Sequence, residues 1–294
     1  MGQLRIFQVD AFTERPLTGN PAAVVLDAEG LTEAQMRAVA RELNTGDTAF
    51  VLPPDAHDHD LRVRFLTRQG EAAFVGHATL AVHAALAASG SEPRPRQKQA
   101  SGIVRVELLE RGPPARIAVR APAPRLLAAP EPAALEAALV ALGLERSALD
   151  VRLPPWLAGS SSTRLLIGVS EGSTLAALQP DLGRLAQLAG AVGAPGFFLF
   201  SLRPAVPGVQ TEARMFCPAL GIPEDPVSGN AHALLAIYLR ERGLLPPDGF
   251  AGAQGHHMHR PGRVEIRLEE ADGVLRAVSI VGQAALAFAT TLTL

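Results

Sequence analysis

A weak internal repeat constrains the fold of this chain more than any other sequence feature. A strand-like run, a loop, a glycine followed by a polar residue and an alanine-rich helical stretch occur at Gly76-His77-Ala78 and again at Gly229-Asn230-Ala231. The two glycines are 153 residues apart in a chain of 294 residues. A duplication of this kind predicts two similar lobes, with two helices that begin at equivalent places and face one cleft.

Hydrophobic patterning predicts that strands and helices alternate along the chain. Strands are predicted at residues 4–9, 22–26, 61–66, 104–109, 116–120, 163–169, 196–202 and 212–216. Helices are predicted at residues 32–43, 76–88, 132–142, 182–190 and 231–242, with Thr32 as the N-cap of the first. The proline-rich residues 121–124 suit a linker better than a strand interior, which places a domain boundary there. The pattern is that of a mixed α/β (α+β) protein.

Composition excludes several classes of function. With 48% hydrophobic and 19% charged residues the chain has material for a large core, and no apolar run is long enough to span a bilayer. A net charge of −2 gives no positive field for nucleic-acid binding. Cys217 is the single cysteine, so no intrachain disulfide, multi-cysteine zinc site or pair of catalytic thiols is possible. We expect a cytoplasmic protein, because no targeting segment is visible.

The two glycine-led helices indicate an anionic ligand. A glycine at the start of a helix exposes backbone N–H groups at the positive end of the helix dipole. Gly76 and Gly229 are therefore expected to hold a carboxylate, or an enolate that forms during a reaction. The predicted partner is a small anionic metabolite.

A proton carrier is expected beside these helices, and Asp47 is the candidate. It lies between a predicted helix and the apolar run Thr48-Ala49-Phe50-Val51, in what is expected to be a short turn. A positioned carboxylate can take and give a proton, although an aspartate at a turn can also simply cap it. His77 can bind substrate or act as a second acid/base, or be structural. Asp225 can bind a substrate amine or hydroxyl, or lie in a solvated loop.

Several motifs together resemble the phenazine-biosynthesis PhzF-like family. They occur in the family's order over nearly the whole chain, and as a set they are specific. They are Gly19-Asn20-Pro21-Ala22-Ala23-Val24, Asp47-Thr48-Ala49-Phe50-Val51, Gly70-Glu71, Gly76-His77-Ala78-Thr79, Arg214-Met215-Phe216, Gly221-Ile222-Pro223-Glu224-Asp225-Pro226-Val227-Ser228-Gly229-Asn230-Ala231, Gln254-Gly255, Met258, Arg260-Pro261-Gly262 and Val281-Gly282-Gln283-Ala284.

The resemblance implies a diaminopimelate-epimerase-like fold. It has two pseudo-symmetric lobes, each a curled β-sheet around a central helix, and the protein is expected to be a homodimer. We expect an N-terminal lobe over residues 1–122, to which a last strand at about residues 286–294 returns, and a C-terminal lobe over residues 123–285.

The resemblance also implies a cofactor-independent isomerase or epimerase that acts on a small carboxylate-bearing metabolite, such as a dihydro-hydroxyanthranilate. By position, the family's proton-shuttling carboxylate, usually Glu, falls on Asp47, which is one methylene shorter. Substrate-binding positions carry over to Gly76, His77, Asp225, Gly229 and Asn230. The family's Asp-Pro-Ala-Thr-Gly-Ser loop reads Asp225-Pro226-Val227-Ser228-Gly229-Asn230 here.

Three rival functions follow from the same residues. Two-thiol racemisation, known on this fold, is excluded because Val75 and Ser228 precede the two glycines. A metal enzyme would need the imidazoles of His256, His257 and His259, but no nearby acid or cysteine completes a ligand set, and an exposed polar loop is favoured. The remaining alternative is a catalytically silent small-molecule-binding protein, in which the change from Glu to Asp marks lost catalysis.

Overall fold

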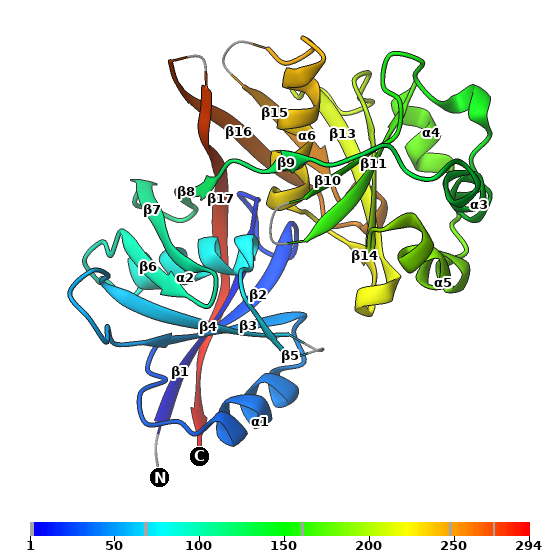
Figure 1. Ribbon diagram of the computed structural model, residues 1–294. Helices are drawn as coiled ribbons and strands as arrows, with labels where there is room; N and C mark the ends of the chain where they lie inside the picture. Colours follow the sequence, from blue (N-terminus) through cyan, green and yellow to red (C-terminus); the bar gives the residue numbers. More distant parts are fainter. Residues whose placement is uncertain (1–2, 68–69, 160–161, 247–248, 273) are drawn as a thin grey trace. The chain divides into compact units, whose positions relative to one another are not determined.

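The structure is a computed structural model that describes residues 3–67, 70–159, 162–246, 249–272 and 274–294 (Figure 1). The chain forms two compact units. Unit 1 comprises Met1–Ala121 and Ser279–Leu294, and unit 2 comprises Pro122–Val278. Unit 2 is thus an insertion in the sequence of unit 1, and it begins within the proline-rich stretch. No helix of the described residues is both long and apolar enough to cross a membrane.

Unit 1 is a β-sheet built around one central helix. The helix α2 (Gly76–Ala88) packs on the first three strands, and ten of its residues are buried. Such a helix is apolar on all sides because it is surrounded by protein. The other elements are β1 (Gln3–Ala11), β2 (Asn20–Val25), α1 (Glu33–Leu43), β3 (Asp47–Leu52), β4 (Leu61–Thr67), β5 (Gly70–Ala72), β6 (Arg96–Gln99), β7 (Gly102–Glu110), β8 (Ala115–Pro122) and most of β17 (Val274–Thr293).

Unit 2 has a central helix of the same kind, α6 (Gly229–Glu241), and ten residues of this helix are also buried. A second apolar cluster in this unit lies around α3 and α5. The other elements are β9 (Arg125–Leu126), α3 (Pro132–Leu142), β10 (Trp156–Gly159), β11 (Thr163–Val169), α4 (Gly172–Ala177), α5 (Leu182–Val192), β12 (Gly196–Ser201), β13 (Thr211–Cys217), β14 (Ile222–Asp225), β15 (Phe250–Gln254) and β16 (Gly262–Ala271), with 3₁₀ turns at Arg146–Ala148, Pro218–Leu220 and His256–Met258.

The two units share one order of strand pairing. In unit 1, β1–β2 is antiparallel, β2–β3 parallel, β3–β4 and β4–β5 antiparallel, β4–β6 parallel and β6–β7 antiparallel. In unit 2, β10–β11, β11–β12, β12–β13, β13–β14, β13–β15 and β15–β16 repeat this series. The central helix follows the fifth strand of each series. The predicted fold class, two similar lobes of sheet around a helix, is confirmed.

Local sequence explains where the helices begin. Thr32 caps α1, where its side chain accepts from the backbone N–H of Gln35 while the Gln35 side chain accepts from the Thr32 N–H. Helix α6 begins at Gly229, two residues before the predicted start. Its N-cap Ser228 accepts a hydrogen bond from the N–H of Ala231, so the first turn already includes Gly229.

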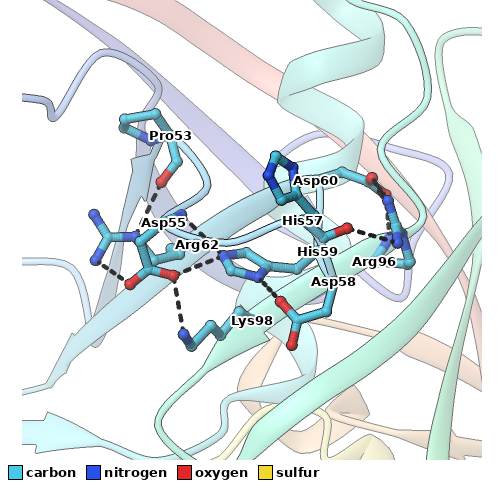
Figure 2. A network of polar contacts seen from close by, with 9 residues as sticks. All are labelled: Pro53, Asp55, His57, Asp58, His59, Asp60, Arg62, Arg96 and Lys98. Atoms are coloured by element: carbon cyan, nitrogen blue, oxygen red, sulfur yellow. Dashed lines mark hydrogen bonds and ion pairs between the residues drawn. The ribbon is translucent and has the colours of Figure 1, made fainter.

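A polar network fixes the loop between β3 and β4 in unit 1 (Figure 2). The buried ring of His59 lies between two carboxylates, with Nδ1 2.6 Å from Asp58 Oδ1 and Nε2 3.0 Å from Asp55 Oδ1. Lys98 of β6 and Arg62 of β4 also bind Asp55. The bond from Lys98 holds the pKa of the Asp55 carboxyl below its usual range. Surface pairs of this kind contribute little free energy singly, but together they join the loop to β4 and β6.

The last strand differs in length from the prediction. β17 begins at Val274 rather than near residue 286, and its first residues belong to unit 2. From Ala284 onward it pairs antiparallel with β1, ending opposite Gln3. The chain therefore returns to unit 1 along one continuous strand.

Candidate active site

Asp47 is the first residue of β3, not a turn residue as expected from the sequence. Its Cα pairs with that of Thr67 at the end of β4. The hydroxyl of Thr45 donates to the Asp47 carbonyl oxygen at 3.2 Å, which fixes the backbone just before the strand. The Asp47 side chain is 17% exposed. The carboxylate is therefore held by regular sheet structure and is still reachable by a small molecule.

His77, the second residue of α2, lies against this carboxylate. Its Nε2 is 3.1 Å from Asp47 Oδ2, and its side chain is 13% exposed. Helix α2 packs on β3, which brings these two sequence-predicted residues together. The separation is that of an ion pair, although the orientation of the ring is not that of a hydrogen bond from Nε2. The pair has the residue types, the distance and the partial exposure that acid/base chemistry requires.

The central helices of the two units start in the same way. In α2 the Thr79 hydroxyl donates to the carbonyl oxygen of Val75 at 2.9 Å. In α6 the ring Nδ1 of His232 makes the same contact with the carbonyl oxygen of Ser228, also at 2.9 Å. In each case the fourth helical residue binds the N-cap carbonyl. Burial lowers the pKa of His232 to about 4, so its ring is neutral at neutral pH and donates through Nδ1–H.

The other predicted site residues lie in unit 2, around the start of α6. Asp225 is the last residue of β14 and is half-buried, Gly229 is buried, and Asn230 is half-buried. A side chain that sequence reasoning did not single out holds the loop between them. Gln254 is 1% exposed, donates from Nε2 to the Asp225 carbonyl oxygen at 2.7 Å and accepts the Ser228 N–H at 3.1 Å. The only sequence signal for Gln254 was its place in the family motif.

Of the acidic pair Glu224-Asp225, Glu224 is a structural residue. Arg214 of β13 donates to both its carboxylate oxygens, at 2.8 Å and 2.9 Å, and also to two backbone carbonyls near α4. A bidentate pair of this kind is satisfied without any ligand. The Glu224 carboxylate is therefore engaged in holding β13 and β14 together.

Cys217, at the end of β13, is not a nucleophile. Its thiol is buried, and burial raises its pKa to about 12. A thiol in this state carries almost no thiolate at neutral pH.

The three imidazoles that suggested a metal do not form a metal-ligand group. His256 and His257 lie in a 3₁₀ turn, and His257 Nε2 is 3.9 Å from Glu212 Oε1. Across the residues that the structure describes, no group of three or more histidine, cysteine, aspartate or glutamate side chains is arranged to hold a metal ion.

Comparison with solved structures defines the class of fold first. The chain resembles a hydroxyproline epimerase from Agrobacterium vitis with a TM-score of 0.62 at 14% identity, covering 99% of this chain and 93% of that one. It resembles a PhzF-family phenazine biosynthesis protein of Bacillus anthracis with a TM-score of 0.87 at 27% identity, and the match covers both chains completely. The architecture is thus that of the epimerase-like and PhzF-like proteins.

The sequence gives the family. Residues 9–290 match the PhzC-PhzF family, described as phenazine biosynthesis-like protein, and the chain belongs to it. It is 34% identical over 290 residues to the uncharacterized isomerase YddE of Escherichia coli K12, covering 97% of this chain and 96% of that protein. It is 32% identical over 283 residues to trans-2,3-dihydro-3-hydroxyanthranilate isomerase of Pseudomonas aeruginosa, covering 96% of each. The chain is accordingly an isomerase of this family.

Proposed function

We propose that this protein is a cofactor-independent isomerase or epimerase in which Asp47 moves a proton on a small carboxylate-bearing metabolite. The observation that carries the proposal is the contact of Asp47 with His77, 3.1 Å long, made by two partly exposed side chains at the start of a helix. In the proposed reaction Asp47 takes a proton from a carbon atom of the substrate, and the C–H electron pair moves into a conjugated enol or enolate. Asp47 then returns the proton to a different carbon, or to the opposite face.

The other residues expected from the sequence would supply the remaining requirements of this chemistry. The imidazole of His77 lies against the Asp47 carboxylate and orients it, and His77 can also serve as a second acid/base. Backbone N–H groups at Gly76 and Gly229, each the first residue of its helix, stabilise negative charge on the substrate. Asp225 and Asn230 bind amine or hydroxyl groups of the substrate.

A relative's name supports the proposed substrate class. A relative is named as an isomerase of trans-2,3-dihydro-3-hydroxyanthranilate, a cyclic amino acid with a hydroxyl group. Asp47 is one methylene shorter than the Glu typical of the family, and proton transfer is sensitive to ångström-scale placement. We therefore propose a dihydro-hydroxyanthranilate-like acid rather than that compound itself.

Proton exchange with solvent tests the proposal directly. The protein is incubated in D₂O with trans-2,3-dihydro-3-hydroxyanthranilate and a panel of small cyclic amino and hydroxy acids, and deuterium uptake is followed by mass spectrometry. Asp47→Asn should lose about 10²-fold to 10⁴-fold of the exchange rate, whereas Asp47→Glu should keep part of it. The matched control is Asp181→Asn, since asparagine caps α5 as well as aspartate does.

Two outcomes would contradict parts of this proposal. Binding of an acid without any deuterium uptake by the wild-type protein would favour the alternative, a catalytically silent binding protein, which the shorter Asp47 side chain also fits. Exchange that is abolished by a chelator and restored by a metal ion would overturn cofactor independence.

A further inference from the structure

The position equivalent to Asp47 in unit 2 is Gly196. Asp47 is the first residue of β3 and pairs with Thr67, the last residue of β4. Gly196 is the first residue of β12, and the register of β12 with β13 places it level with Cys217, the last residue of β13. Since the two units share one order of strand pairing, unit 2 has no side chain where unit 1 has its proton carrier.

The side chain of Arg164 occupies the space that this glycine leaves. Arg164 and Gly196 are Cα partners in the parallel pairing of β11 with β12. A Cβ atom added at Gly196 would lie 2.5 Å from Arg164 Cδ, 2.8 Å from Arg164 Nε and 2.7 Å from Cys217 Sγ. Real Cβ atoms do not approach other atoms so closely. The path of the Arg164 side chain therefore depends on glycine at position 196.

Arg164 lies on the α6 face of the sheet, at the end where α6 begins. Side chains two residues apart in a strand share a face, so Gly196, Phe198 and Phe200 form a row. Phe200 contacts Tyr238 late in α6, and Phe198 contacts His232 in its first turn, with ring centroids 5.9 Å and 5.3 Å apart. Continuing the row by one step places Gly196 and Arg164 at the level of the helix start.

Asp225 belongs to the same part of unit 2. Its Cα pairs with that of Met215, two residues before Cys217 in β13. The thiol of Cys217 lies close enough to both side chains for their charges to act on it. The charge of Arg164 lowers the pKa of Cys217 and the charge of Asp225 raises it, and both effects are smaller than the effect of burial. A cation, an anion and a helix start are thus gathered around one end of the sheet.

The hydrogen bonds of the Arg164 guanidinium go to neutral acceptors. Its Nη1 donates to Ser162 Oγ at 2.5 Å and to the Thr163 carbonyl oxygen at 2.8 Å, and both acceptors are neutral. Within the described residues no salt bridge joins Arg164 to a carboxylate, in contrast to the bidentate pair of Arg214 with Glu224. A half-buried cation beside the positive end of a helix is stabilised when an anion binds there.

We propose that Arg164 binds the carboxylate group of the substrate, with its Nε and Nη2 donating to the two carboxylate oxygens. A guanidinium presents these donors in a planar fork that matches a carboxylate. Asp225 then takes an amino or hydroxyl group of the same molecule, so the substrate is an amino or hydroxy acid. The identity of this anion as the substrate rests on the proposed function, whereas the anion site itself does not.

Equilibrium binding tests the site without turnover. The probes are anthranilate, which carries a carboxylate beside an amine, and anthranilamide, its neutral counterpart, and calorimetry measures the dissociation constants. Arg164→Met should weaken anthranilate binding about 10-fold to 100-fold, as expected for charge-assisted hydrogen bonds, and change anthranilamide binding less than twofold. Arg164→Lys should recover part of the loss, because it restores the charge without the fork.

A second variant changes the site without removing Arg164. Gly196→Ala places a Cβ against the Arg164 side chain and should weaken anthranilate binding in the same direction. The matched control is Gly190→Ala, at an exposed helical position where an added Cβ meets nothing within 4 Å. Arg184→Met, on the exposed part of α5, removes the same charge elsewhere in unit 2 and should leave both dissociation constants unchanged.

Three outcomes overturn the proposal. In the first, Arg164→Met binds anthranilate as tightly as the wild-type protein does. In the second, Arg164→Met loses equal affinity for anthranilate and for anthranilamide. In the third, the wild-type protein does not bind anthranilate more tightly than anthranilamide, or binds neither. Arg164-dependent binding of anthranilate together with the absence of any proton exchange would disprove the proposed function and leave the anion site standing. Thermal unfolding of each variant checks that the fold is retained.

Discussion

The Nε2 atom of His77 lies 3.1 Å from the Oδ2 atom of Asp47, which joins the second residue of α2 to the first residue of β3. Neither residue type is distinctive alone, since aspartate is common at turns and histidine in cores. Their contact, at a place where both side chains are still partly exposed, supports the proposal that they act together as an acid/base pair.

This contact predicts that substitutions at the two positions are not additive. His77→Gln removes the imidazole that orients Asp47, so proton exchange should slow in the wild-type background. In the Asp47→Asn background the same substitution should have little further effect, because residues in contact couple by about 0.5–3 kcal/mol. The rates of deuterium uptake by the wild-type protein, the two single variants and the double variant give the coupling free energy between the two side chains. Full additivity would show that the two side chains act separately.

Gln254 is expected to stabilise the loop before α6. Gln254→Met keeps the volume but leaves the Asp225 carbonyl oxygen and the buried Ser228 N–H without their partner. The free energy of unfolding should fall by about 1–3 kcal/mol, the cost of leaving buried polar groups unsatisfied. Gln254→Glu should lose at least as much, because its buried carboxylate still accepts from Ser228 but cannot donate to the Asp225 carbonyl oxygen. Chemical denaturation measures both, and Gln187→Met on the exposed face of α5 is the neutral control. A fully stable Gln254→Met protein would show that water replaces the side chain.

The buried histidines predict how stability depends on pH. Burial lowers the pKa values of His83 and His232 from 6.5 to about 4. As pH falls below 6.5 the unfolded chain takes up protons at these positions and the folded chain does not. The contribution of the two histidines to the free energy of unfolding therefore decreases down to about pH 4 and is constant below it. The stability that paired carboxylates contribute is lost at a lower pH. For Asp150 the hydrogen bond from Arg152 lowers the pKa below 3.8, so its contribution is lost only as pH falls below that value.

Denaturation at a series of pH values checks this slope. Replacing both histidines with glutamine, which can still hydrogen-bond Gln97 and the Ser228 carbonyl, should flatten the curve between pH 6.5 and pH 4. Ile237→Val should shift the whole curve down by about 0.5–1.5 kcal/mol without changing its slope. An unchanged slope in the double variant would mean that these rings are protonated in the folded protein.

Cys217 should resist thiol reagents while the protein is folded. Its pKa of about 12 leaves almost no thiolate at neutral pH, and its side chain is inaccessible. Iodoacetamide labelling, followed by mass spectrometry, should therefore be slow in buffer and complete in denaturing urea. Rapid labelling of the native protein would show that the end of β13 opens.

The fold was predictable because its signals are local and repeated. Thr32, the apolar spacing that follows it and the two Gly-polar starts at positions 76 and 229 all indicate structure within a few residues. The bounds of α3 and β11 match the predicted residues, because proline and periodic apolar residues mark them in the sequence.

The groups that meet around the start of α6 were not predictable in the same way. Gln254 reaches the loop at Asp225 across 29 residues of sequence, and Arg164 depends on a glycine in a neighbouring strand. Strand register decides both contacts, and a glycine in a strand gives no sign of which side chain uses its space. The short strands β5, β9 and β14 likewise have too few residues for a period to be recognised.

The insertion of unit 2 into unit 1 has a consequence for biosynthesis. β1 is made before unit 2, but its partner in β17 is made after nearly all of unit 2. Unit 2 is continuous in sequence and can close its own pairings first, while one side of β1 stays unpaired until β17 has been made. An unpaired strand edge during that interval can pair with other chains, so β1 is the segment of unit 1 that a chaperone would need to shield.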